Sequence, residues 1–158
     1  MFRDPMSAPA TSFYKRSNFV THLPVDCLYS PSHFWIAKMG GTRLRIGFTK
    51  FATRMLGELV EANFPLTEGD AVEPGQSIGG VEGFKAASEV LCVMRGAFVG
   101  MNPALAADAC LVKSDPYEVG WLYAVRGEPE EDSLDVHGYV ALLQATIQKM
   151  QDAGYGGD

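Results

Sequence analysis

A repeated segment in the middle of the chain constrains the fold more than any other feature. Residues 69–78 and 96–105 each begin with glycine, place valine three residues later, continue with turn-forming residues and end on an aliphatic side chain. Internal repeats mark structural units that pack beside one another. Two copies of a strand–turn–strand unit predict a β structure with approximate two-fold symmetry. The segment midway between them, residues 82–88, is then a connecting hairpin at one extremity of the molecule.

The remaining patterns predict further strands around this repeat. Alternating or continuous apolar residues over 33–38, 43–46 and 58–64 are typical of strands. Between residues 68 and 121, short apolar runs are separated by Gly, Pro and Asn, as in β sandwiches and barrels. We therefore predict a mainly β fold.

Two kinds of helix are expected. Thr49 and Gly57 have the residue types that begin and end a short helix, and Asn102 with Pro103 can start a helical turn. An apolar stripe at helical spacing predicts a C-terminal helix that packs on the β body. The predicted organisation is a flexible leader over 1–19, a β domain over 20–126, an acidic linker over 127–134 and the terminal helix over 135–153.

The charge and the cysteines exclude several classes of function. The formal net charge is −6, so neither nucleic acid nor an anionic membrane surface is an expected partner. Cys27, Cys92 and Cys110 lack the spacing of metal ligands, and we expect no metal site. An odd number of scattered cysteines favours thiols in a reducing compartment. With no secretory signal pattern at the N-terminus, the expected location is the cytoplasm.

Lys85 occupies the predicted hairpin, in the segment Glu82-Gly-Phe-Lys85-Ala-Ala-Ser. A lysine that carries a swinging cofactor needs an exposed ammonium, a stiff backbone and small neighbours, and this turn offers all three. The plainer interpretation is a solvated lysine in a turn, which is the usual situation of a lysine.

Several motifs, taken together, resemble the glycine cleavage H proteins over about residues 20–150. They are Tyr29-Ser-Pro-Ser-His33-x-Trp35, Gly47-Phe-Thr-Lys-Phe-Ala, Leu56-Gly57-Glu58-Leu-Val, Gly69-Asp-x-Val-x-x-Gly75-Gln, Val81-Glu82-x-x-Lys85-Ala-Ala-Ser, Gly96-x-x-Val-x-x-Asn102-x-x-Leu and Ser114-Asp-Pro-Tyr117-x-x-Gly-Trp121-Leu. The resemblance implies the barrel-sandwich hybrid fold of lipoyl and biotinyl domains, with lipoic acid attached covalently to Lys85. Biotin is disfavoured because Phe84 and Ala86 stand where biotin carriers have methionine. Glu82 resembles the acid that lipoate-attaching enzymes recognise.

The function implied by the resemblance is carriage and not catalysis. The lipoyl group would take an aminomethyl group from glycine decarboxylase to an aminomethyltransferase, and dihydrolipoamide dehydrogenase would reoxidise it. The same scaffold also serves as a lipoate carrier in sulfur oxidation and in lipoyl relay, which is the alternative. A non-lipoylated interaction module is a third possibility, against which the intact motif around Lys85 argues.

The chain departs from the family pattern in the cleft expected to shelter the arm. By resemblance, Ser32, His33, Phe34, Met55 and Glu89 line this cleft. Phe34 stands where the family typically has an acid, and Met55 where it often has histidine. Both changes make the expected cleft more apolar, and a cation leaving water needs a carboxylate or good hydrogen bonds. These departures leave a lipoyl carrier of the H-protein type as the expected function and are the reason for keeping the other carrier roles as the alternative.

Overall fold

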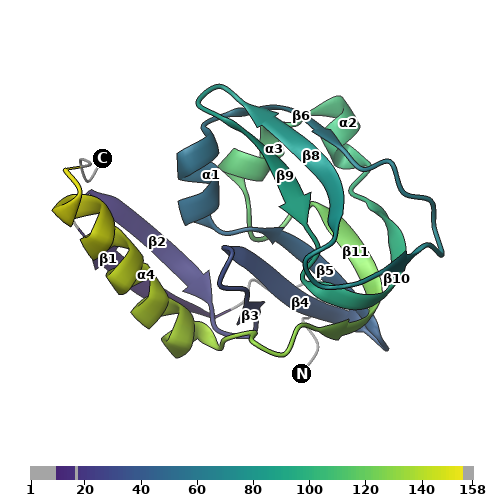
Figure 1. Cartoon of the computed structure of the whole chain (residues 1–158), viewed down its shortest axis with the longest axis horizontal. Helices are drawn as coiled ribbons and strands as arrows, with labels where there is room; N and C mark the ends of the chain where they lie inside the picture. Colours follow the sequence, from purple (N-terminus) through teal and green to yellow (C-terminus); the bar gives the residue numbers. More distant parts are fainter. Residues whose placement is uncertain (1–9, 17, 155–158) are drawn as a thin grey trace.

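Two β-sheets face each other and form the body of the molecule (Figure 1). The structure is a computed structural model that describes residues 10–16 and 18–154. The larger sheet has the strand order β3 (Leu28–Tyr29), β4 (Phe34–Gly40), β5 (Arg43–Phe48), β11 (Tyr123–Pro129), β10 (Met94–Met101) and β7 (Ala71–Val72). The smaller sheet has the order β6 (Leu59–Asn63), β8 (Ser77–Gly83) and β9 (Ala87–Leu91). The predicted barrel-sandwich fold is confirmed.

Side-chain alternation along the strands explains the main core. On β5, Leu44, Ile46 and Phe48 are buried and face the smaller sheet, whereas Arg43 is exposed. Ile78 and Val90 meet them from β8 and β9. Because successive side chains of a strand point to opposite faces, each sheet contributes every second residue to this core.

The helices begin and end where capping residues predict. Helix α1 (Lys50–Leu56) follows Thr49 and stops at Gly57, whose positive φ of 76° suits glycine. The C-terminal helix α4 (Val136–Asp152) begins after Asp135, whose carboxylate accepts a hydrogen bond from the amide of Gly138 at 2.8 Å. Two short helices, α2 (Ala104–Ala107) and α3 (Leu111–Ser114), lie between β10 and β11.

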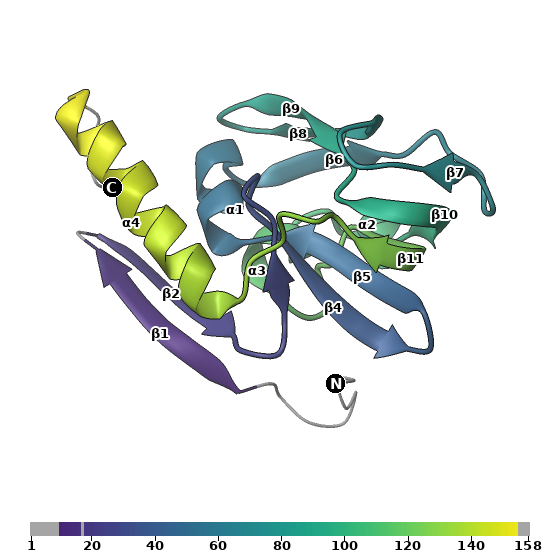
Figure 2. The same ribbon diagram turned by 60° about the horizontal axis from the view of Figure 1, so that its bottom comes forward.

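A second, smaller core lies on the far face of β4. Strands β1 (Thr11–Arg16) and β2 (Phe19–Pro24) form an antiparallel hairpin that runs along α4 (Figure 2). The buried members of this core come from the hairpin, α4, β3, β4 and α1: they include Tyr14, Phe19, Leu23, Tyr29, Trp35, Phe51, Tyr139 and Leu143. We call this assembly the hairpin–helix layer.

The structure corrects two predicted boundaries. The expected flexible leader over 1–19 is wrong for residues 11–16, which form β1 and bury Tyr14, and for Phe19, which begins β2 and is buried. Residues 1–9 and 17 lie outside the described residues. Strand β1 was not predicted because the side chain of Tyr14 is buried only against elements that are distant in the sequence, such as α4. The expected acidic linker over 127–134 is wrong at its start, because β11 continues to Pro129.

None of the helices in the described ranges is both long enough and apolar enough to cross a membrane.

Candidate functional site

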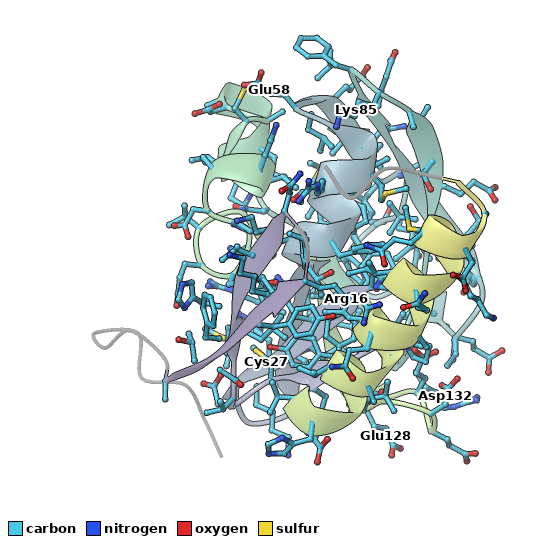
Figure 3. All side chains as sticks on the ribbon, turned by 90° about the vertical axis from the view of Figure 1, so that its left-hand side faces the viewer. Arg16, Cys27, Glu58, Lys85, Glu128 and Asp132 are labelled. Atoms are coloured by element: carbon cyan, nitrogen blue, oxygen red, sulfur yellow. The ribbon has the colours of Figure 1, made fainter. Side chains whose placement is uncertain are left out.

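Lys85 lies in the turn that joins β8 to β9, as predicted. The predicted second strand–turn–strand unit at 96–105 is wrong, because β10 is followed there by α2 and not by another strand. Its side chain is exposed, and the neighbouring Phe84 is 77% exposed. Figure 3 shows Lys85 at one end of the molecule and Glu128 with Asp132 at the opposite end. An enzyme therefore has open access to the ammonium group.

The turn is held rigidly although its side chains are exposed. Three backbone hydrogen bonds fix it: Gly83 N donates to Ala86 O (2.9 Å), Phe84 N to Glu58 O (3.0 Å) and Lys85 N to Leu56 O (2.9 Å). The Nζ atom of Lys85 also donates to the carbonyl oxygen of Arg54 at 3.3 Å. The end of α1 thus supports both the backbone and the side chain of Lys85.

Two glycines allow this close contact between α1 and the turn. A Cβ at Gly57 would lie 2.9 Å from Cγ of Lys85, and a Cβ at Gly83 would lie 2.3 Å from the carbonyl oxygen of Leu56. Larger residues would push the two elements apart. The motif Leu56-Gly57-Glu58 therefore supplies both acceptor carbonyls and the space between them.

A hollow of about 270 Å³ lies beside α1. All five residues predicted for the cleft line it: Ser32, His33, Phe34, Met55 and Glu89. Six further lining residues escaped prediction: Phe48, Phe51, Ala52, Leu56, Ser88 and Leu91. The helical spacing of Phe51, Ala52 and Met55 indicates that they share one face of a short helix. Only the tertiary structure shows which strands lie opposite that face.

The walls of the hollow are mainly apolar. Phe34 is 4% exposed and stacks on Phe48, with ring centroids 5.1 Å apart. Met55 is 48% exposed and lies at the open side. Glu89 is the one lining residue with an ionisable acid, and its carboxylate accepts a hydrogen bond from Ser77 at 3.2 Å. The hollow therefore favours uncharged groups.

His33 contributes no positive charge to the hollow near neutral pH. Burial lowers the pKa of its imidazole to about 4. Its Nδ1 lies 2.8 Å from the hydroxyl of Tyr139, which also lies 2.7 Å from the hydroxyl of Thr49. The ring packs against Phe51 at 4.7 Å between centroids. Helix α4 thereby fixes a side chain of the hollow.

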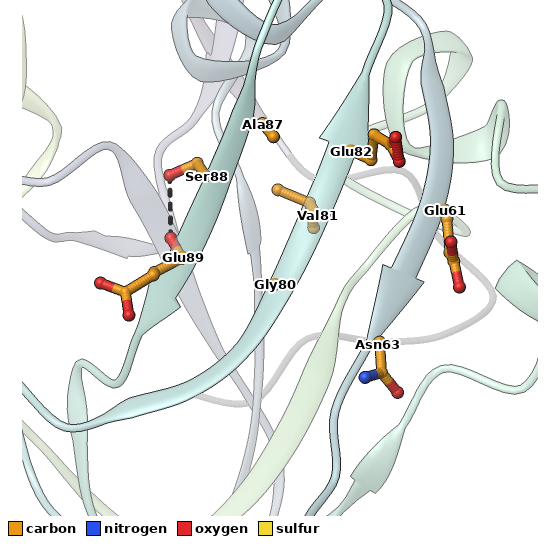
Figure 4. A pocket seen from close by; sticks show the side chains of 8 residues that line it. All are labelled: Glu61, Asn63, Gly80, Val81, Glu82, Ala87, Ser88 and Glu89. Atoms are coloured by element: carbon orange, nitrogen blue, oxygen red, sulfur yellow. Dashed lines mark hydrogen bonds between the residues drawn. The ribbon is translucent and has the colours of Figure 1, made fainter.

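Glu82 faces a second, shallower groove on the outer surface of β6, β8 and β9. This groove has a volume of about 510 Å³, and Glu61, Glu82 and Glu89 line it (Figure 4). Glu82 is exposed on β8, three residues before Lys85. An enzyme that approaches Lys85 from this side meets an acidic surface.

The site can hold a covalent cofactor on Lys85. The exposed amine, the rigid turn and the small residues Ala86 and Ala87 fit a lipoyl group joined through an amide, with an apolar hollow beside it. Within residues 10–16 and 18–154, no three His, Cys, Asp or Glu side chains gather as ligands for a metal ion.

Known proteins share both the sequence and the fold of this chain. The sequence model described as "Glycine cleavage H-protein" matches residues 27–146. The glycine cleavage system H protein of Corynebacterium jeikeium is 36% identical over 125 residues, which are 77% of this chain and 98% of that protein. That of an Enterobacter species is 34% identical over 79% of this chain and 98% of its own length. The crystal structure of a glycine cleavage system H protein from Mycobacterium marinum superposes with a TM-score of 0.70 at 31% identity, covering 77% of this chain and 99% of that one. The chain belongs to the glycine cleavage H-protein family.

Proposed function

We propose that this protein is a lipoyl carrier of the glycine cleavage system and that Lys85 is its attachment residue. The single observation that carries the proposal is the exposed Lys85 on a turn pinned to α1 by backbone hydrogen bonds. A swinging arm is useful only if its base is stiff, because the arm and not the protein must then move. Membership of the H-protein family supports the same role.

The chemistry belongs to the cofactor and to the partner enzymes. When bound, lipoate supplies a disulfide and dithiol pair that can accept, carry and release an aminomethyl group. The proposed partners are glycine decarboxylase, an aminomethyltransferase, dihydrolipoamide dehydrogenase and the enzymes that attach lipoate. Lys85 supplies the amide nitrogen, the turn holds the arm at the end of the molecule, and the protein itself catalyses no reaction.

The acidic groove is the proposed approach side for the attaching enzyme, with Glu82 as a recognition residue. We also propose the cytoplasm as the site of action, since Cys27, Cys92 and Cys110 are thiols.

The hollow beside α1 is the proposed resting place of the arm. Its walls, Phe34, Phe51 and Met55 among them, suit the uncharged disulfide form better than a cationic amine. This observation favours a second candidate function, a lipoate carrier in sulfur oxidation or lipoyl relay on the same Lys85. A non-lipoylated interaction module has no comparable support, because it needs neither an exposed lysine nor a supported turn.

Mass spectrometry of the modified protein tests the assignment. The full chain is co-expressed with a lipoate ligase in the presence of lipoate, and its peptides are mapped. We expect a lipoyl group on Lys85 and none on Lys38, Lys50 or Lys113. Lys85→Arg should abolish the modification and change the free energy of unfolding by no more than about 0.5 kcal/mol, because the position is exposed.

Modification of another lysine with Lys85 bare would contradict the proposal. Adding glycine and a glycine decarboxylase to the lipoylated protein separates the two candidate functions. Formation of an aminomethylated product supports glycine cleavage, and a lipoylated protein that no glycine decarboxylase loads supports the alternative.

A further inference from the structure

The β1–β2 hairpin lies outside the part of the chain that the family model matches. The family match covers residues 27–146, whereas the hairpin consists of Thr11–Arg16 and Phe19–Pro24. It is nevertheless a fully packed part of the structure, since Tyr14, Phe19 and Leu23 are buried. An ordered element outside the matched residues indicates a structural feature that is specific to this chain.

One side of the hairpin is fixed to α4. Arg16 donates hydrogen bonds to the side chains of Gln148 and Gln151 near the end of that helix. Leu23 on β2 and Leu143 on α4 are both 0% exposed in their shared core. Helix α4 therefore holds the hairpin in place.

The hairpin also contacts α1 at two points. The ring of Phe19 meets Phe51 edge to face, with centroids 5.7 Å apart, and lies 5.6 Å from the guanidinium carbon of Arg54. At the first residue of α1, the hydroxyl of Tyr117 accepts a hydrogen bond from the amide of Lys50 at 2.9 Å and lies 3.3 Å from the hydroxyl of Thr21. Strand β2 thus contacts the first turn of α1 directly through Phe51 and indirectly through Tyr117, and it reaches Arg54 one turn later.

Helix α1 needs such support because it is only seven residues long and its N-cap residue makes no side-chain capping bond. Isolated helices of this length are unstable in water, so tertiary contacts must hold them. The same helix supplies Phe51 and Met55 to the hollow and the carbonyl groups of Arg54 and Leu56 to Lys85. Any movement of α1 would move both parts of the site.

We propose that the β1–β2 hairpin is a brace that fixes α1, and through α1 the hollow and the Lys85 turn, with Phe19 as the main positioning residue. This inference rests on the proposed function for the role of Lys85. By holding α1, the hairpin stiffens the base of the arm.

Hydrogen exchange on the unmodified full chain tests the brace directly. In Phe19→Ala, the amides of α1 and those of Phe84 and Lys85 should exchange about tenfold faster than in the wild type. Phe13→Ala is the matched control, because Phe13 is 60% exposed on the opposite face of the same hairpin. It should leave these amides unchanged.

Two milder variants show whether faster exchange in Phe19→Ala comes from the lost contact with α1 or from general unfolding. Phe19→Leu keeps an apolar contact with Phe51 and should restore most of the protection. Thr21→Val keeps the shape of the side chain but removes its hydroxyl from Tyr117, and it should speed exchange at the beginning of α1. Equal exchange of α1 in Phe19→Ala, Phe13→Ala and the wild type would overturn the proposal.

A second measurement connects the brace to the arm. On the lipoylated protein, a water-soluble phosphine should reduce the lipoyl disulfide about twofold faster or more in Phe19→Ala than in Phe13→Ala, because a displaced α1 shelters the arm less. Equal reduction rates would show that the brace does not reach the arm. If the wild type accepts no lipoate, the proposed carrier function is wrong. The hydrogen-exchange experiment uses the unmodified chain, so it still tests whether the hairpin fixes α1.

Discussion

At the residue scale, the site depends on side chains held by groups far away in the sequence. His33 has a positive φ of 72°, unusual for a residue with a side chain, and its imidazole is fixed by Tyr139 from α4. Lys85 reaches the carbonyl of Arg54, and Met55 next to it opens onto the hollow. Lys85 and the hollow therefore contact the same short stretch of α1.

The lowered pKa of His33 predicts a pH-dependent stability. The folded pKa is about 4 against an ordinary value of 6.5, so the unfolded chain takes up the proton first as the pH falls. His33 therefore does not lower the free energy of unfolding above about pH 6.5. As the pH falls from there towards 4, the free energy of unfolding decreases by about 3 kcal/mol in total. Denaturant unfolding at several pH values measures this loss.

His33→Asn is the control for that titration, since asparagine tolerates positive φ and does not titrate. The variant should lack the part of the slope that His33 contributes between pH 6.5 and 4. Identical pH profiles for the two proteins would contradict the assignment.

Glu82→Ala should slow lipoate attachment without unfolding the protein. Glu82 is exposed, so the free energy of unfolding should change by no more than about 0.5 kcal/mol. If an attaching enzyme recognises this carboxylate, the rate at limiting ligase should fall by at least about fivefold. Glu61→Ala, in the same groove on the neighbouring strand, is the matched control. An equal fall in both variants would indicate general charge and not recognition of Glu82.

At the element scale, α1 organises the site because it lines the hollow together with residues of β4 and β9 and its end contacts the Lys85 turn. Its lining residues Phe51 and Met55 face the hollow, and its last carbonyls face the turn. Phe34 on β4 stacks on Phe48 and is 4% exposed, so a carboxylate placed there would be buried beside aromatic rings. Met55, which is half exposed, is the better position for adding a charge.

Met55→Glu should improve the shelter of a cationic amine. The lipoylated protein is loaded with glycine and a glycine decarboxylase, and the release of formaldehyde and ammonia is followed. A carboxylate at a half-exposed position contributes up to about 1 kcal/mol, so release should slow by up to about fivefold. Met55→Gln, of similar shape but neutral, should behave as the wild type does. Slow release from the wild type itself would show that Glu89 or another group already holds the amine.

At the scale of the whole molecule, the two cores are joined through β4 and α1, since Leu56 lies in the main core and Phe51 in the second. Phe34 and Ile36 of β4 face the main core, while Trp35 and Ala37 face the hairpin–helix layer. The hydroxyl of Tyr139 extends from α4 to Thr49 at the start of α1. We therefore expect the two cores to unfold together.

Leu143→Ala tests this coupling. Leu143 is 0% exposed, and its truncation should lower the free energy of unfolding by about 2–4 kcal/mol. Fluorescence of the two tryptophans and far-ultraviolet circular dichroism should report one common transition. Gln144→Ala, exposed on the same helix, should cost less than about 0.5 kcal/mol. Two separate transitions would mean that the hairpin–helix layer unfolds independently.

The amino-acid sequence by itself determined the local elements and the location of Lys85. Short-range patterns suffice for these features: Thr49 and Gly57 mark the ends of α1, and the repeat places Lys85 in the β8–β9 turn. The family motifs also predict the fold, because proteins that share these motifs share one fold.

Only the tertiary structure decided what surrounds that lysine. The pairing of β1 with β2, the contact of Phe19 with α1 and the bond from Tyr139 to His33 join residues that are far apart in sequence. No local pattern encodes such contacts, because burial of Tyr14 or the pKa of His33 depends on which distant surface excludes water. The brace and the depth of the hollow are therefore properties of the packed molecule alone.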